Sequence, residues 1–259
     1  MTRSTRGFSS VELLVAMAVM TTCMAALLSL VGMAQSIARL QPEAADQQQR
    51  ARLARQAIAD ALARAGAGLD RGSLAGPLAA YFPPVSRSAE GGLTIWSVTG
   101  PQSQAALAQP LGTSATTADV AVEPFCAAGE STCAFAPDTS AIVFDAGGCH
   151  EVLRIDDVLP SVLVLRPAIR GCAFGAGAPI AAGEVRTFFV DPSTRQLLRR
   201  DEATGSIQPV VDNVAAMDLV IDDGGRHVRV SLRFVSLVAR VPDFTFAFDT
   251  APPNLQGPR

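Results

Sequence analysis

The stretch of sequence that decides the fold runs from residue 7 to residue 34 and reads GFSSVELLVAMAVMTTCMAALLSLVGMA. No charged residue occurs from Leu13 to Ala34. At a rise of about 1.5 Å per residue, a helix of this length spans about 33 Å, enough to cross a hydrocarbon layer of about 30 Å. Arg3 and Arg6 precede the segment, and their charge predicts a cytoplasmic N-terminus. The sequence therefore predicts a single-pass inner-membrane protein whose C-terminal domain is periplasmic.

The residues that follow the apolar stretch argue against an ordinary secretory signal, which would be removed. Such a signal ends in a small-x-small cleavage site, whereas residues 35–40 read QSIARL and make a poor site of that kind. The apolar stretch is also longer than the hydrophobic region of a usual signal peptide. We therefore expect the helix to remain on the mature protein.

The order of Gly7, Phe8, Glu12 and a long apolar helix resembles the type IV prepilin signal, also called class III. The resemblance implies that a prepilin peptidase removes residues 1–7 as a leader peptide and that Phe8 becomes the methylated first residue. Residues 8–34 would then form the transmembrane and assembly helix. Glu12, the fifth mature residue, would pair with the N-terminal amine of an adjacent subunit in a filament. From the residues alone, its carboxylate could equally extend to the lipid headgroups.

The helix is expected to continue as an amphipathic segment over residues 35–68. Apolar residues recur there at steps near three, four or seven: Leu40, Ala44, Ala51, Ala54, Ile58, Ala61, Leu62 and Ala65. Polar residues follow steps of four on another face: Arg52, Gln56, Asp60 and Arg64. Gly66 and Gly68 are natural stops, and Pro42 is expected to kink the helix or melt it locally. The apolar stripe should pack on a sheet of the same subunit.

A β-rich head domain is predicted for residues 69–259, because short apolar runs and period-two alternation replace the helical pattern. The predicted strands are Leu93–Val98, Asp119–Glu123, Ser140–Asp145, His150–Ile155, Ser161–Arg166, Val185–Val190, Gln196–Arg199, Met217–Ile221, His227–Phe234 and Phe244–Phe248. Turns at residues 191–194 and 222–225 predict two hairpins. Residues 99–118 are rich in small polar residues and are predicted to be a loop. The fold class is therefore α+β.

Four motifs follow in order through the C-terminal half: FFVD at 188–191, QLLRR at 196–200, PVVDNV at 209–214 and VRVSL at 228–232. Their order resembles the larger minor pilins of the PilW type and the related J-type pseudopilins of type II secretion. The resemblance implies a pilin fold, in which the long helix packs on an antiparallel sheet.

The resemblance implies that the protein is a minor pilin that helps to initiate assembly of a type IV pilus. The tip of the pilus is one position that such a subunit could occupy. The partners would be the prepilin peptidase and other minor and major pilins or pseudopilins. A J-type minor pseudopilin is the nearest alternative. A periplasmic binding protein or enzyme held by a signal anchor is a third reading.

Four of the five cysteines lie outside the apolar helix, an even number that suits disulfides in an oxidising compartment. Four cysteines allow three connectivities. We favour Cys126–Cys133 and Cys149–Cys172, because each closes a short local loop. Four reduced thiols are the alternative, and zinc is disfavoured because no CxxC pair is present.

Composition and motifs give no reason to expect an enzyme, a cofactor or a metal site. The formal net charge of −3 does not favour nucleic acid as a partner. Serine-hydrolase, zinc-protease, P-loop and EF-hand signatures are absent from the sequence. His150 and Glu151 are interpreted as a strand end with both side chains in solvent, with an acid/base pair as the alternative. The acidic pairs at 156–157 and 222–223 are interpreted as turn residues, with calcium binding as the alternative.

Overall fold

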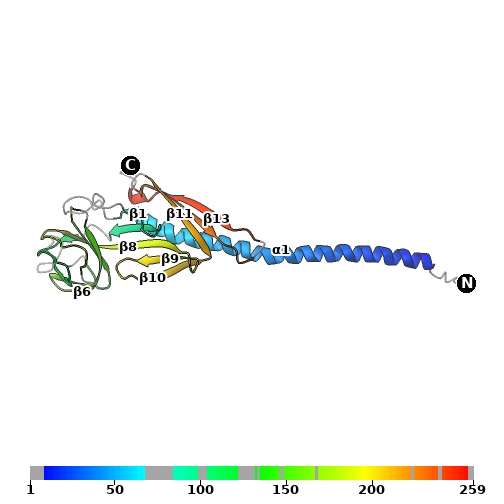
Figure 1. Ribbon diagram of the computed structural model, residues 1–259, viewed down its shortest axis with the longest axis horizontal. Helices are drawn as coiled ribbons and strands as arrows, with labels where there is room; N and C mark the ends of the chain where they lie inside the picture. Colours follow the sequence, from blue (N-terminus) through cyan, green and yellow to red (C-terminus); the bar gives the residue numbers. More distant parts are fainter. Residues whose placement is uncertain are drawn as a thin grey trace, which may run out of the picture. The chain divides into compact units, whose positions relative to one another are not determined.

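The structure, a computed structural model, describes residues 9–67, 84–98, 104–121, 132, 135–145, 147, 149–166, 169–222, 225–238 and 241–255. The chain divides into two compact units. Unit 1 comprises residues 1–48 with 236–242, and unit 2 comprises residues 49–235 with 243–259. The described elements confirm the α+β fold class, with one long N-terminal helix and antiparallel sheets (Figure 1).

The helix α1 extends from Ser10 to Arg64 and remains helical through Pro42. The expected local melting at this proline is therefore wrong. The next residue, Glu43, connects α1 to the segment 236–238 by hydrogen bonds within unit 1. Its carboxylate accepts hydrogen bonds from the Leu237 amide at 3.0 Å and the Ser236 hydroxyl at 3.3 Å.

Gly66 ends the helix as its sequence position predicted. Its φ of +72° lies in the left-handed region that glycine adopts without steric penalty. Its amide donates to the Trp96 carbonyl at 3.0 Å, so the chain leaves the helix and meets strand β2, Leu93–Val98. The Asn254 side-chain amide donates to the Ala63 and Ala65 carbonyls at 3.1 and 3.3 Å. These bonds satisfy acceptors that a helix end leaves free.

The strands largely follow the predicted order, and two coincide with their predicted bounds, namely β2 and β12. β12 extends over His227–Phe234. The remaining strands are β1 (Val85–Arg87), β3 (Gln104–Ala106), β4 (Thr117–Asp119), β5 (Ser140–Phe144), β6 (His150–Val158), β7 (Val162–Arg166), β8 (Pro179–Asp191), β9 (Gln196–Asp201), β10 (Ile207–Asp212), β11 (Val214–Asp222) and β13 (Phe244–Thr250). A short 3-10 helix at Pro253–Leu255 follows. Both predicted hairpins are confirmed, β8 with β9 and β11 with β12.

Several sequence predictions about strands differ from the structure, and β1 was not predicted at all. The presumed loop 99–118 contains β3 and the start of β4. Of the strand expected at Asp119–Glu123, Asp119 is the last residue of β4, and residues 122 and 123 lie outside the described residues. β3 is only three residues long and forms because it pairs with β8. β10 was missed because it contains Pro209, which lies beside a register shift at the point where a proline is tolerated.

Strand β8 connects the parts of the larger sheet, whose path runs β1-β2-β8-β5-β6-β7-β4. The N-terminal part of β8 pairs with β3 and β5, and its C-terminal part pairs with β2 and β9. β10 adds to β9, and β11-β12-β13 form a separate three-stranded sheet. One thirteen-residue strand therefore joins two regions of the sheet.

The largest described core of unit 2 contains the end of α1 and strands from both sheets (Figure 1). The helix contributes Ala51, Ala54, Ile58, Ala61, Leu62 and Ala65. The polar face is exposed at Arg52, Gln56, Asp60 and Arg64, which confirms the amphipathic pattern over these residues. Ala44 is exposed, so the buried stripe is shorter than predicted. Along β12, Val228, Val230, Leu232 and Phe234 are buried and His227, Arg229 and Arg233 are exposed, as the alternation predicted.

A second core consists of residues between Ala105 and Ala182. It contains Phe174, Leu153 and Leu163 among its most deeply buried side chains. The middle of the chain therefore forms a β-rich region with a hydrophobic interior of its own, whose members lie close together in sequence.

Candidate functional site

The first turn of α1 is closed by hydrogen bonds that Ser9 makes with Val11, Glu12 and Leu13. The Ser9 amide donates to Glu12 Oε2 at 3.0 Å, and the Ser9 hydroxyl accepts from the Val11 amide at 3.3 Å. The Leu13 amide donates to the Ser9 carbonyl at 3.2 Å, which makes Ser9 the N-cap. The bond from the Ser9 amide to the Glu12 carboxylate is one half of a capping box, while the Ser9 hydroxyl accepts from the second amide of the helix, that of Val11. The carboxylate also lies at the positive end of the helix dipole, where negative charge is stabilised.

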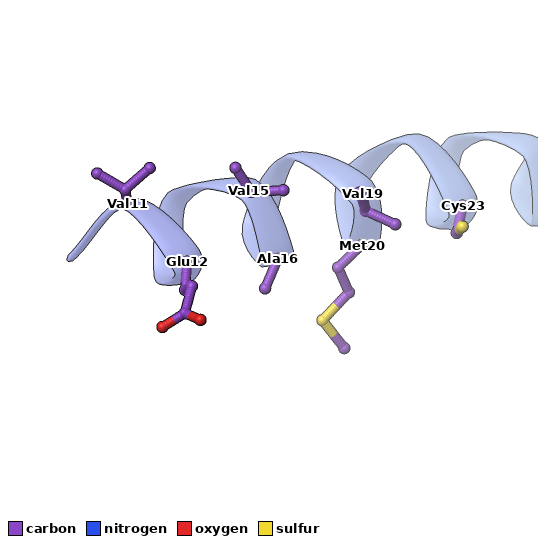
Figure 2. A pocket seen from close by; sticks show the side chains of 7 residues that line it. All are labelled: Val11, Glu12, Val15, Ala16, Val19, Met20 and Cys23. Atoms are coloured by element: carbon purple, nitrogen blue, oxygen red, sulfur yellow. The ribbon is translucent and has the colours of Figure 1, made fainter. Parts of the chain in front are cut away.

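Glu12 belongs to a shallow groove along one side of α1 (Figure 2). The groove is lined by Val11, Glu12, Val15, Ala16, Val19, Met20 and Cys23. Apart from Glu12, these side chains are apolar or weakly polar, and all are exposed. A helix surface of this kind is stable when lipid or another apolar helix covers it. The groove thus combines one carboxylate with a long apolar surface.

The threonines in the apolar segment satisfy their hydroxyl groups within the helix itself. Thr21 donates to the Ala18 carbonyl at 2.9 Å, and Thr22 donates to the Val19 carbonyl at 2.8 Å. Such bonds to preceding carbonyls remove the penalty of placing a hydroxyl in an apolar medium. They leave Glu12 as the polar group in this segment whose charge requires compensation.

α1 is long and apolar enough to cross a membrane, and its most apolar window is not buried inside the protein. The prediction of a helix with the length and composition to span a membrane is therefore confirmed. Gly7 and Phe8, the predicted cleavage and methylation positions, lie outside the described residues.

Comparisons with known proteins identify no family. A scan of protein-family models found none that matches the chain, and a search of curated proteins also found no match. The functional assignment therefore depends on the residues and their geometry.

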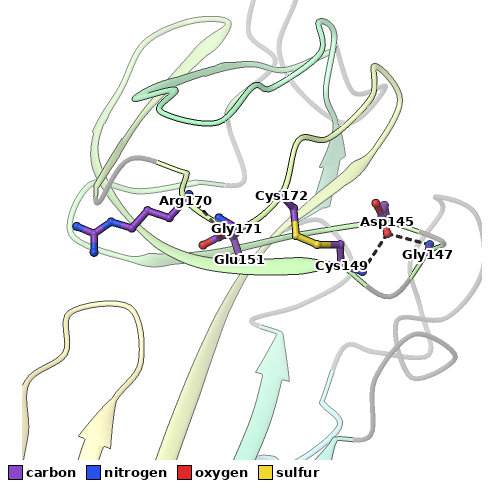
Figure 3. The surroundings of a disulfide bond; sticks show 7 residues. All are labelled: Asp145, Gly147, Cys149, Glu151, Arg170, Gly171 and Cys172. Atoms are coloured by element: carbon purple, nitrogen blue, oxygen red, sulfur yellow. Dashed lines mark hydrogen bonds between the residues drawn. A yellow bond between two sulfur atoms is a disulfide. The ribbon is translucent and has the colours of Figure 1, made fainter.

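The predicted disulfide between Cys149 and Cys172 is confirmed, with their Cα atoms 6.4 Å apart (Figure 3). Cys23 is a free, exposed cysteine. Cys126 and Cys133, the second predicted pair, lie outside the described residues. The disulfide connects the start of β6 to the segment that precedes β8.

Glu151 strengthens this connection in a way that the sequence interpretation missed. Its carboxylate is half-buried and accepts hydrogen bonds from the Arg170 amide at 3.2 Å and the Gly171 amide at 2.5 Å (Figure 3). A Cβ at residue 171 would lie 2.9 Å from Glu151 Oε1, so glycine permits the close approach. His150 packs edge-on against Trp96, with ring centroids 5.1 Å apart. The prediction that both side chains lie in solvent was therefore wrong for Glu151, whereas His150 is exposed at the first position of β6.

Loss of the disulfide should lower the stability of the protein substantially. The two cysteines are separated by 23 residues in the sequence, and the bond closes this loop in the unfolded chain. We therefore expect the double substitution Cys149→Ser and Cys172→Ser to reduce the free energy of unfolding by about 3 kcal/mol. Urea denaturation of the full chain in detergent measures the change. Cys23→Ser is the matched control and should have no effect. Equal stability of the double variant and the native protein would contradict the expectation.

Asp156 is not a turn residue, contrary to the sequence interpretation. It lies within β6, and its carboxylate forms an ion pair of 2.7 Å with Arg166 of β7 and lies 3.8 Å from Arg154 Nε. Arg154 and Arg166 are register partners, so Asp156 offsets the repulsion between two opposed cations. Among the described residues, no three His, Cys, Asp or Glu side chains form a group that could hold a metal ion. Asp223 is outside the described residues, so the second acidic pair is only partly described.

Proposed function

We propose that the chain is a type IV prepilin-like structural subunit, a minor pilin of the PilW type, that packs into a pilus through residues 8–34. The observation that carries this proposal is Glu12, an acid in the first turn of an apolar, exposed helix. A charge near the centre of a bilayer costs about 2.5–3.5 kcal/mol and less near its edge. An acid at such a position is best explained by a cation that meets it during assembly.

The cation that fits is the N-terminal amine of a neighbouring subunit. Cleavage between Gly7 and Phe8 would create a positively charged amine at the start of the helix. One Glu12 oxygen accepts the Ser9 amide, and a carboxylate has two acceptor oxygens. The other oxygen is therefore able to accept a bond from the amine of a second chain. The apolar side chains around Glu12 would pack against that chain's helix and exclude water from the ion pair.

We further propose that α1 and the sheets together constitute a pilin fold. Arg3 and Arg6 favour a cytoplasmic N-terminus, so the β-rich part of the chain would be periplasmic before assembly. The disulfide between Cys149 and Cys172 supports this location, because such bonds persist in oxidising compartments. On this proposal the prepilin peptidase and other pilins are the partners, and the chain has no catalytic role.

The experiment that tests this function is the intact mass of the native protein recovered from sheared surface filaments. We expect a chain that begins at Phe8 and carries one methyl group on its amine. A chain that retains Met1, or one that begins beyond Ala34, would contradict the proposed processing. Absence of the processed chain from the filament fraction would contradict assembly into a pilus.

A further inference from the structure

A cavity of about 350 Å³ in unit 2 is lined by three arginines that the proposed assembly does not use, Arg154, Arg186 and Arg199. They come from three strands, β6, β8 and β9. Asp201 contributes one carboxylate to the lining, so the walls carry more positive than negative charge. Small-molecule sites in proteins have volumes of about 300–1,000 Å³, and this cavity is within that range.

Arg186 and Arg199 lie on a face of the sheet that also contributes side chains to the hydrophobic core. On β8, Phe188 is buried in the main core of unit 2 and Arg186 lies two residues away, on the same face. On β9, Leu197 is buried in that core and Arg199 is again two residues away. The sheet face therefore changes from apolar to cationic within one alternation of each strand. Charged side chains directed to an inward face usually have a partner.

The partners visible in the protein use only part of the hydrogen-bonding capacity of these arginines. Arg186 pairs with Glu184 at 2.7 Å, Arg154 bonds to Asp138, and Arg199 bonds to the Gln208 amide oxygen. A guanidinium has five N–H donors, so each retains donors for a ligand. Among the described residues, Arg154 Nε is buried and has no hydrogen-bond partner, although it lies 3.8 Å from a carboxylate oxygen of Asp156.

The electrostatic surroundings of Arg186 also favour an anion in the cavity. Burial lowers the pKa of its guanidinium, and the neighbouring cations Arg64 and Arg199 lower it further, although Glu184 raises it. The charged form of Arg186 is thus disfavoured by poor solvation and by like charges. An anion in the cavity would relieve both effects.

The neutral groups of the lining define the rest of the ligand. Thr204, Ser206 and Gln208 contribute hydroxyl and amide groups to the lining, and Asp201 contributes a carboxylate. The Thr204 hydroxyl already donates to Asp201 Oδ1 at 3.2 Å, and the Gln208 amide oxygen accepts from Arg199. These groups suit the hydroxyls of a sugar, and the cavity is larger than a bare phosphate requires. We propose that this cavity binds a small oxyanion, a carboxylate or phosphate group carried on a hydroxylated molecule such as a sugar acid or sugar phosphate.

Calorimetric titration of the full chain in detergent tests the proposal, with glucuronate and glucose 6-phosphate as probes and glucose as the neutral counterpart. We expect the charged sugars to bind, glucose to bind at least about tenfold more weakly, and added salt to reduce the difference. Arg199→Gln should weaken binding of the charged sugars by about tenfold. Arg199→Lys, which retains the charge, should recover part of the loss. Arg233→Gln removes an exposed arginine on β12 and should leave binding unchanged.

Several outcomes would overturn the proposal. Failure of both charged sugars to bind would exclude the site, as would equal losses in the Arg199→Gln and Arg233→Gln variants. Inorganic phosphate that binds as tightly as glucose 6-phosphate would refute the role of the hydroxyl groups. Thermal unfolding of each variant verifies that it is folded, and Arg199→Lys provides a second folded variant if Arg199→Gln is unstable.

Discussion

Replacement of Gly7 by valine is expected to abolish processing, so that residues 1–7 remain on the chain. The proposed peptidase would have to accept a branched side chain directly before the bond that it cuts. The uncleaved chain would keep Arg3 and Arg6 next to the apolar helix, and no amine would form at Phe8. We therefore expect the variant to stay in the inner membrane and to be absent from surface filaments. The intact mass of the membrane fraction and immunoblots of sheared filaments measure both effects.

A glycine within α1 supplies the control. A Cβ added at Gly32 would meet no atom within 4 Å, so Gly32→Val makes the same chemical change without a clash inside the protein. We expect this variant to be processed normally. If Gly7→Val gave a mature chain that begins at Phe8 and assembles as the native protein does, the prepilin interpretation would fail.

Replacement of Glu12 by glutamine should leave processing intact but reduce incorporation into filaments more than a hundredfold. Removing one partner of a buried ion pair costs about 3–5 kcal/mol, because the remaining charge is left uncompensated. Each 1.4 kcal/mol corresponds to a factor of about ten. Quantitative immunoblots of filament and membrane fractions give the incorporated share.

Glutamine is the informative substitution because it separates two roles of Glu12. A capping box accepts glutamine in place of glutamate, so the bond with the Ser9 amide can persist while the charge is lost. Loss of a helix cap costs about 1 kcal/mol, roughly a fivefold effect. If pairing with an amine dominates, Glu12→Gln and Glu12→Ala should be equally defective. Native-like incorporation of Glu12→Gln together with a modest defect in Glu12→Ala would assign the residue to capping alone.

The features that could be predicted from the sequence depend on near neighbours in the chain. The strand His227–Phe234 alternates residue by residue, and Gly66 supplies the left-handed turn that ends α1. The disulfide between Cys149 and Cys172 was predicted because it closes a short loop. The capping box was missed, although the spacing of Ser9 and Glu12 is its sequence signature.

The features that could not be predicted depend on pairing between distant segments. β3 has little strand propensity of its own and forms because it pairs with β8, which lies far along the chain. Glu151 looked solvent-exposed because its partners, the amides of residues 170 and 171, become neighbours only in the folded protein. Asp156 looked like a turn acid because nothing local shows that Arg166 lies beside it.

The sequence by itself determined the long apolar helix, its acidic first turn and the α+β class, because hydrophobic periodicity and glycine conformation act over a few residues. Only the tertiary structure decided that β8 would join two regions of the sheet and that Arg154, Arg186 and Arg199 would line one cavity. The physical reason is that strand pairing brings together side chains far apart in sequence. Their combined charge is therefore a property of the folded sheet and of no single segment.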